Sequence, residues 1–285
     1  MNGFDYVEPA SLGEALEAVA RDGDDAIVMA GGTAVVLLLK QDLIRPARVL
    51  ALRRLDALRG IASDGTLRIG ALETHAALAR SRAVHEHAPA LAATFASVAT
   101  VRIREQATVG GNLAHADPAQ DPPVTLLALD AVIVVASSAR GERRIPIAEL
   151  FVDLFETSLE PDELVLRVEI PPLPDGARAT YKKFLPRSAD DYATVSVAAV
   201  LARDASGRCT HARIALGAAG PVPLRARDAE RSLEGHVVDD SAIHQAGALA
   251  AAETDPIEDL RGGADYKRAM AAVWTERALR EVAQG

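Results

Sequence analysis

Two short segments carry residue types that bind phosphate groups. One is Ala30-Gly31-Gly32-Thr33, and the other is Thr108-Val109-Gly110-Gly111-Asn112. Because glycine has no Cβ, the backbone of such a turn can approach a ligand closely, and its amides can point at phosphate oxygens. The first segment is neither a GxGxxG fingerprint nor a P-loop, so it indicates neither a Rossmann domain nor an NTPase. Taken alone, it also fits an ordinary tight turn between a strand and a helix.

The second glycine segment continues into a polar stretch that ends with Asp121. Two glycine turns could bind the two phosphates of one dinucleotide, and Asp117 or Asp121 could then accept a hydrogen bond from a ribose hydroxyl. Because residues 108–123 include adjacent glycines, two aspartates and three prolines, we expect a long loop rather than a core element. The alternative is a plain surface loop, although an irregular loop of this length is uncommon in a compact domain unless it is functional.

A third candidate lies further along the chain, between Lys182 and Tyr192. Lys183 could meet a phosphate group or the edge of a flavin, and Tyr192 offers a planar face to a ring system. A charged run of this kind is also typical of a solvated strand entry, and the residues alone leave that alternative open.

The composition excludes several kinds of chemistry. Cys209 is the single cysteine of the 285 residues, so the chain cannot form an intrachain disulfide, a cysteine-based zinc site or its own iron–sulfur cluster. The histidines lack the spacing of a metal site, and no serine lies in a GxSxG elbow. We therefore expect no metal and no catalytic nucleophile. A redox group would have to be organic or belong to a partner chain.

The charge and the apolar runs bear on partners and location. The chain has 31 Lys and Arg against 40 Asp and Glu, a net charge of −9, and this lack of a basic footprint argues against nucleic acid as a partner. The first residues contain neither a basic segment nor an apolar core, so we expect no signal peptide. Apolar runs such as 34–39 and 131–136 are far shorter than the roughly 20 residues that span a bilayer. We expect a soluble, cytoplasmic protein without a transmembrane segment.

The elements around the first glycine turn are predicted to be a strand and a helix. The apolar run 26–30 predicts a buried strand and residues 34–39 a helix, the arrangement in which a helix N-terminus can face an anion. Residues 10–20 predict an amphipathic helix with Ser11 as its N-cap. Further expected elements are strands at 48–52, 66–69 and 164–170, a helix from Thr74 to Ser81, a longer helix over 88–101, and apolar elements at 124–129 and 131–136.

A proline-rich segment, residues 171–176, is the clearest boundary in the chain. Beyond it, residues 193–202 and 210–217 alternate as two strands, and the pattern is helical from Ser241 onward. At about 150 residues per domain, the length suggests about two domains. The expected fold class is α+β, with mixed sheets up to about residue 175, followed by a small antiparallel sheet with helices.

In this order and at these distances, the segments resemble the FAD-binding medium subunit of the molybdenum hydroxylase family, which includes carbon monoxide dehydrogenase and xanthine dehydrogenase. The resemblance covers nearly the whole chain. It implies a FAD-binding domain of the PCMH type over residues 1–175, in two subdomains split near 55–60, and a C-terminal domain of the carbon monoxide dehydrogenase flavoprotein type over 176–285. The matching segments are residues 4–6, 11–20, 30–33, 69–75, 108–121, 191–194 and 265–268.

The resemblance also implies the binding residues. The two glycine turns would hold the pyrophosphate of a noncovalently bound FAD, and no residue here need be a catalytic acid or base. Asp121 matches an acidic residue that contacts the cofactor, Lys183 a lysine near it, and Tyr192 a tyrosine that covers one face of the isoalloxazine. Thr33-Ala34 replaces a His-Ser or Gln-Ser pair of some relatives, so backbone contacts are expected there rather than side-chain contacts. The implied cofactor-binding residues are Met29, Ala30, Gly31, Gly32, Thr33, Ala34, Val35, Thr108, Val109, Gly110, Gly111, Asn112, Asp117, Asp121, Val165, Lys183 and Tyr192.

An electron-transfer role follows from the same resemblance. A partner would oxidise substrate at molybdenum, and electrons would pass through iron–sulfur clusters to the FAD and on to an external acceptor such as NAD or a quinone. Molybdopterin and 2Fe-2S clusters are expected only in partners, a large molybdopterin subunit and a small iron–sulfur subunit, in a dimer of heterotrimers. Two alternatives are a stand-alone FAD-dependent oxidoreductase acting on its own small substrate and an assembly subunit that has lost its flavin.

Overall fold

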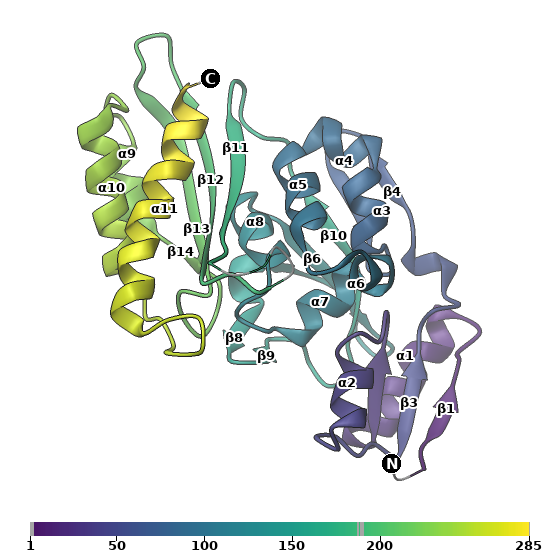
Figure 1. The fold of residues 1–285 in the computed structure, drawn as a ribbon. Coiled ribbons are helices and arrows are strands. Elements are labelled where there is room, and N and C mark those ends of the chain that lie inside the picture. Colours follow the sequence, from purple (N-terminus) through teal and green to yellow (C-terminus); the bar gives the residue numbers. More distant parts are fainter. Residues whose placement is uncertain (1–2, 187, 189–190, 285) are drawn as a thin grey trace.

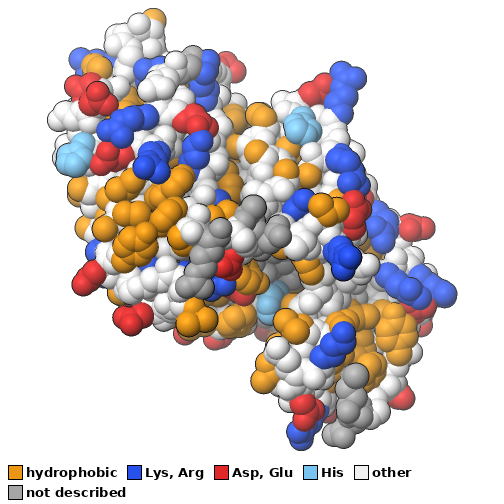
Figure 2. Space-filling view, in the orientation of Figure 1, with side chains coloured by type: hydrophobic (Ala, Val, Ile, Leu, Met, Phe, Trp, Pro, Cys, Tyr) orange, Lys and Arg blue, Asp and Glu red, His pale blue; other side chains and the backbone are white. Residues whose placement is uncertain are grey.

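The N-terminal lobe is built around a three-stranded parallel sheet (Figure 1). The structure is a computed structural model, and it describes residues 3–186, 188 and 191–284. The strand order is β1-β3-β2. Ser11 caps the first helix as predicted, because its hydroxyl accepts a hydrogen bond from the backbone amide of Glu14 at 3.2 Å. In Figure 2 the lobe is separated from the rest of the molecule by a hollow. The elements are β1 (Asp5–Val7), α1 (Leu12–Asp22), β2 (Ala26–Met29), α2 (Val35–Lys40) and β3 (Arg48–Ala51).

The central part of the chain forms a five-stranded antiparallel sheet in the order β4-β5-β10-β6-β7. Six short helices follow one another between β5 and β6, and a two-stranded hairpin, β8-β9, precedes β10. The strands are β4 (Ile61–Ser63), β5 (Leu67–Gly70), β6 (Val132–Ser137), β7 (Gly141–Pro146), β8 (Phe151–Asp153), β9 (Glu156–Thr157) and β10 (Leu164–Ile170). The helices are α3 (His75–Arg80), α4 (Arg82–His87), α5 (Pro89–Ser97), α6 (Val101–Gln106), α7 (Val109–His115) and α8 (Pro122–Ala128).

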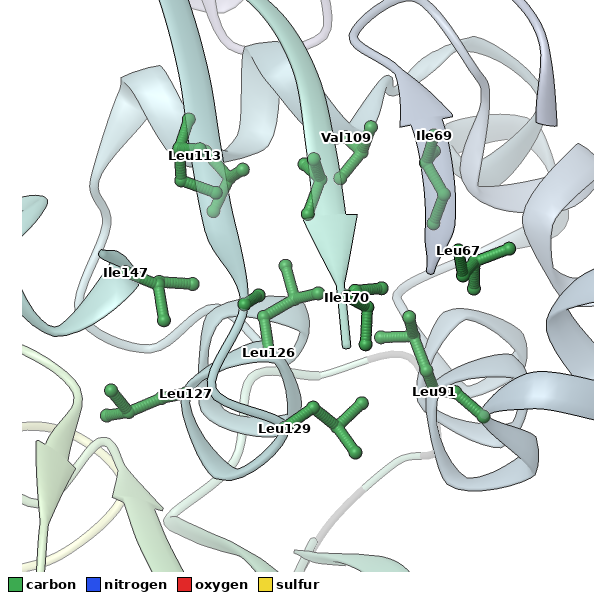
Figure 3. Close-up of a cluster of buried hydrophobic side chains, with 14 of the residues drawn as sticks. Leu67, Ile69, Leu91, Val109, Leu113, Leu126, Leu127, Leu129, Ile147 and Ile170 are labelled. Carbon is green, nitrogen blue, oxygen red and sulfur yellow. The ribbon is translucent and has the colours of Figure 1, made fainter. Parts of the chain in front are cut away.

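One large hydrophobic core joins this sheet to its helices (Figure 3). Leu113 of α7 and Leu126 of α8 are fully buried in it together with Ile69 of β5 and Ile170 of β10. Burying one such side chain contributes roughly 1.5–3 kcal/mol. Helices of six or seven residues are not stable alone in water, so this burial is what holds them in place.

The C-terminal part is a four-stranded antiparallel sheet in the order β11-β12-β13-β14, with α10 and α11 over one face (Figure 1). Successive residues of β12 point to opposite faces. Ala198 and Val200 join the central core beside α8, while Val197 and Ala199 pack toward the C-terminal helices. Both faces of β12 are therefore buried. The elements are β11 (Arg178–Phe184), β12 (Val195–Arg203), β13 (Cys209–Gly217), β14 (Leu224–Arg225), α9 (Arg227–Leu233), α10 (Asp240–Ala252) and α11 (Ala264–Gln284).

The α+β class expected from the sequence is confirmed. The mixed sheets expected up to about residue 175 are two separate sheets. The first is entirely parallel and the second is entirely antiparallel. The proline-rich residues 171–176 lie between β10 and β11, the last strand of the central sheet and the first of the C-terminal sheet. None of the helices formed by the described residues is long and apolar enough to cross a membrane.

Two predicted elements differ from the structure. The helix predicted over 88–101 ends at Ser97, and a second helix, α6, begins at Val101. The chain breaks between them because Ala99 adopts a positive φ of 39° and the Arg104 guanidinium donates to the carbonyl oxygens of Val98 and Ala99 at 2.7 and 2.6 Å. The long loop over 108–123 contains helix α7 and the start of α8. Thr108 caps α7, since its hydroxyl accepts from the amide of Gly111 at 3.2 Å.

Candidate cofactor site

A cavity of about 280 Å³ is lined by residues of both the N-terminal lobe and the central part of the chain. Both glycine turns line it, and they lie against each other, since a Cβ on Gly111 would be 3.4 Å from the Cβ of Ala30. Most of the remaining wall is apolar, a composition typical of cofactor and ligand pockets. The expected binding residues that line it are Ala30, Gly31, Gly32, Thr33, Ala34, Val35, Thr108, Gly110, Gly111, Asn112 and Val165.

The first turn presents backbone amides that have no carbonyl partner within the described part of the chain. Val36 donates to the carbonyl of Gly32 at 2.9 Å, but within the described part of the chain the amides of residues 31–34 donate to no carbonyl. Gly32 has a φ of 76°, which favours glycine. At Gly31, a Cβ would lie 1.9 Å from the carbonyl oxygen of Gln106, so this glycine is required for the turn to pack against the end of α6. The turn can therefore donate hydrogen bonds to an anion.

The second turn is the first part of α7. Gly110 packs on the connection after β5, because its amide donates to the carbonyl of Ala71 at 2.9 Å and a Cβ would lie 2.6 Å from the Cβ of Ala71. Val109 is fully buried in the central core and does not line the cavity. Asn112 lines the cavity, and its Oδ1 atom is buried without a hydrogen-bond partner among the described residues.

Five of the expected binding residues besides Val109 lie outside the cavity wall: Met29, Asp117, Asp121, Lys183 and Tyr192. Met29 packs beside Gly32, since its Sδ would lie 3.2 Å from a Cβ there. Asp117 stabilises its own loop by accepting from the amide of Ala119 at 2.9 Å.

Asp121 and Lys183 bind each other. The Lys183 ammonium lies 2.8 Å from Oδ2 of Asp121, and the hydroxyl of Tyr181 donates to Oδ1 at 2.5 Å. Burial raises the pKa of the Asp121 carboxyl, and the nearby Lys183 charge opposes that shift. Lys183 is therefore not part of a solvated strand entry. The pair joins the segment before α8 to strand β11.

Tyr192 is half-exposed and lies under the Arg261 guanidinium, whose central carbon is 5.3 Å from the ring centre. Partial desolvation and the nearby Asp117 carboxylate raise the pKa of Tyr192 to about 12. The side chain is therefore neutral near pH 7, and its ring can cover an apolar surface.

Sequence reasoning missed three polar residues of the cavity wall: His115, Gln120 and Glu163. Glu163 is charge-compensated, because Arg143 donates to both of its carboxylate oxygens at 2.6 and 2.7 Å. His115 contacts the ring of Phe155, with ring centres 5.4 Å apart. Gln120 is buried and immediately precedes Asp121. Its position inside the specific segment 108–121 was the one available signal.

The described residues fit a dinucleotide better than a metal. Unpaired amides in the first turn, uncharged carboxamides and apolar walls suit a flavin nucleotide. No group of three or more His, Cys, Asp or Glu side chains within residues 3–186, 188 and 191–284 could hold a metal ion.

Comparisons with known proteins agree over almost the full length. Residues 2–173 match the family described as the FAD binding domain in molybdopterin dehydrogenase, and residues 179–282 match the CO dehydrogenase flavoprotein C-terminal domain. The chain is 39% identical over 277 residues to the 6-hydroxypseudooxynicotine dehydrogenase complex subunit alpha of Paenarthrobacter nicotinovorans, covering 97% of this chain and 93% of that protein.

Two further relatives bear the name of carbon monoxide dehydrogenase. The medium chain from Hydrogenophaga pseudoflava is 34% identical over 277 residues, with 97% of this chain and 96% of that protein covered. The structure of the Cu,Mo-CO dehydrogenase in its cyanide-inactivated form matches with a TM-score of 0.95 at 34% identity, over 100% of this chain and 99% of that one.

The fold and these matches define a FAD-binding flavoprotein. More narrowly, the chain belongs to the molybdenum hydroxylase family as an FAD-binding medium subunit, and the resemblance carried by the glycine turns is confirmed. It is an oxidoreductase subunit with FAD as its cofactor.

Proposed function

We propose that this chain holds FAD in the cavity and connects iron–sulfur clusters of a partner subunit to an external electron acceptor. The bound flavin would supply the redox chemistry, by exchanging electrons with the clusters and the acceptor. The chain's own residues bind the cofactor, orient it and shield it from water. The observation that carries the proposal is the meeting of both glycine turns at one cavity, where the amides of residues 31–34 have no carbonyl partner among the described residues.

The pyrophosphate is assigned to the glycine turns. Anions are stabilised by backbone amides that have no partner of their own, and residues 31–34 provide such amides. Gly111 lies where a Cβ would project toward Ala30, between the two turns. Glu163 lies in the same wall, and its negative charge is compensated by Arg143. Its carboxylate therefore repels the phosphates less than an unpaired carboxylate would.

The isoalloxazine is assigned to the side where the C-terminal sheet approaches. Lys183 on β11 and Asp121 before α8 meet there as a buried pair, and Tyr192 precedes β12. The half-exposed Tyr192 ring could cover one face of the flavin and leave an edge open to an acceptor. The proposed site is completed by cofactor contacts of Met29, Val109, Asp117 and Val165. Val109 would make its contact through its backbone, because its side chain is buried in the core.

The remaining assignments concern the assembly. We propose a large molybdopterin subunit and a small iron–sulfur subunit as partners in a dimer of heterotrimers located in the cytoplasm, with NAD or a quinone as acceptor. The names of the relatives, a dehydrogenase complex subunit and a medium chain, support a multi-subunit enzyme. We also propose a domain division at 175/176, which the family matches ending at 173 and beginning at 179 support. Within the first domain we propose two subdomains split near residues 55–60.

Purification of the full chain with its neighbours tests the function. The expected result is a yellow protein that releases FAD on denaturation and that co-purifies with a larger molybdopterin-containing chain and a smaller iron–sulfur chain. Rapid flavin reduction by substrate in the complex, but not in the isolated chain, would support the electron route. A colourless chain that takes up no FAD on reconstitution would contradict it, and turnover by the isolated chain would favour a stand-alone oxidoreductase.

A further inference from the structure

Gln120 places an unsatisfied hydrogen-bonding group in the wall of the cofactor cavity. Its side chain is 92% removed from solvent, being 8% exposed, and it lines the same cavity as the two glycine turns. The Oε1 atom is buried without a hydrogen-bond partner, and among the described residues the carboxamide makes no hydrogen bond. Buried polar side chains nearly always have a partner, so an unpartnered carboxamide on a side chain that lines a ligand cavity indicates a contact that the ligand supplies.

The backbone around Gln120 is firmly held. The amide of Gln120 donates to the carbonyl of Asp117 at 3.2 Å, and the amide of Ala218 donates to the carbonyl of Pro118 at 3.1 Å. The next residue, Asp121, is held by Lys183 and Tyr181. The unpartnered carboxamide therefore belongs to a segment whose backbone is held in place before a ligand arrives.

The chemistry of the orphan atom selects a part of the cofactor. A buried carbonyl oxygen needs a donor, and a pyrophosphate offers only acceptors. The carboxamide has one acceptor and one donor end, and its two orientations differ only by a rotation of the amide. A hydroxyl group, which both donates and accepts, satisfies either orientation.

The position agrees with this choice. Gln120 shares the cavity with the glycine turns assigned to the pyrophosphate, while the neighbouring Asp121–Lys183 pair and Tyr192, assigned to the isoalloxazine, lie outside the cavity wall. The part of FAD between these two groups is the ribityl chain, which carries hydroxyls. We propose that the Gln120 carboxamide hydrogen-bonds a ribityl hydroxyl and so positions the flavin between its two anchors. This inference rests on the proposed placement of FAD.

The test compares Gln120→Leu with Gln245→Leu, the same change at an exposed position of α10. The full chain is stripped of FAD and titrated with FAD by flavin fluorescence. Gln120→Leu is expected to weaken FAD binding by about five- to tenfold, the loss of one net hydrogen bond. It should also raise the melting temperature of the FAD-free chain by about 2 °C, since an unsatisfied buried acceptor is removed. Gln245→Leu should change neither.

The opposite signs of these two effects separate a ligand contact from a structural one. A fall in both FAD affinity and FAD-free melting temperature, or an unchanged affinity, would overturn the inference. Gln120→Asn, which keeps a shorter carboxamide, gives a second variant and should lose affinity without gaining the stability of the leucine variant.

FAD analogues that each lack one ribityl hydroxyl identify the contact. The weakening caused by Gln120→Leu should vanish with one analogue. If it persists with all of them, Gln120 makes no ribityl contact. The two proposals fail distinguishably. If the natural chain binds no FAD, the proposed function fails; if it binds FAD and Gln120→Leu binds equally well, this inference alone fails.

Discussion

Lys183 and Asp121 form a buried ion pair that joins the C-terminal sheet to the loop between α7 and α8. The Nζ–Oδ2 distance is 2.8 Å, and the two side chains are only 6% and 4% exposed. Lys183 also donates to the carbonyl of Ser97 at the end of α5, at 3.3 Å. A buried charge is tolerated only when it is compensated. Each side chain of the pair is therefore necessary for the burial of the other.

Replacing Lys183 by methionine should destabilise the FAD-free chain strongly. Asp121 would remain buried without its partner, a change that costs about 3–5 kcal/mol. Lys182→Met is the matched control, because Lys182 pairs with Glu281 at a more exposed site, with side chains 30% and 50% exposed, and should cost less than about 1 kcal/mol. Urea unfolding of both variants measures the difference. Equal losses in the free energy of unfolding would show that the buried pair stabilises the fold no more than the exposed one.

Gly111→Val should abolish retention of FAD. A Cβ at this position would lie 2.9 Å from Oγ1 of Thr108 and 3.4 Å from Ala30, so the valine side chain would occupy the space between the two turns. Gly13→Val is the control, because Gly13 lies at the start of helix α1 and a Cβ there meets only the Ser11 hydroxyl, at 3.9 Å. The measurement is the FAD-to-protein ratio after purification. Full FAD occupancy in Gly111→Val would show that FAD does not bind at the glycine turns.

Local sequence patterns predicted most elements because their signals lie within a few residues. Ser11 and Thr74 cap helices as expected, and the alternation in residues 193–202 and 210–217 corresponds to β12 and β13. The break between α5 and α6 was missed, since no residue type marks the positive φ of Ala99. The helix α7 was missed because Gly110 weakens a helix in isolation, and its close packing on Ala71 compensates for this only in the folded chain.

The site shows the same division between local and distant signals. Segments that resemble the family pointed to both glycine turns, and the structure brings these together. The pairing of Asp121 with Lys183 could not be inferred, because the two residues are 62 positions apart and meet only in the folded chain. Gln120 was missed for a different reason: a glutamine between an alanine and an aspartate carries no pattern of its own until the fold buries its carboxamide without a partner among the described residues.

His75 should make the chain acid-sensitive. Its ring is buried at 1% exposure without a hydrogen-bond partner among the described residues, and burial lowers its pKa from 6.5 to about 4. Between these two pH values the unfolded chain binds a proton that the folded chain does not, so stability falls as the pH drops through this window. The loss reaches on the order of 3 kcal/mol near pH 4.

The variant His75→Phe tests this pH dependence. A phenyl ring keeps the contact with Phe95, whose ring centre lies 5.2 Å away, and removes the titrating group. Urea unfolding at pH 7.5 and 4.5 should show a smaller acid-induced loss in His75→Phe than in the natural chain. His236→Phe, a change at an exposed position, should leave the loss in place. If the natural chain and His75→Phe lose the same stability on acidification, His75 is not the acid-sensitive group.

Tyr192→Ala should alter access to the flavin without disturbing the fold. The side chain is 42% exposed and its ring contacts Arg261, so its removal uncovers little core, and the melting temperature of the FAD-free chain should change by no more than about 2 °C. If the ring covers one face of the isoalloxazine, its loss should raise flavin fluorescence and change the rate of reoxidation by external acceptors. Tyr266→Ala is the control, because Tyr266 is similarly exposed at 46% but packs beside Phe184 instead. Unchanged fluorescence and rates in Tyr192→Ala would place the isoalloxazine away from this ring, and the proposed route for electrons would then need a different exit.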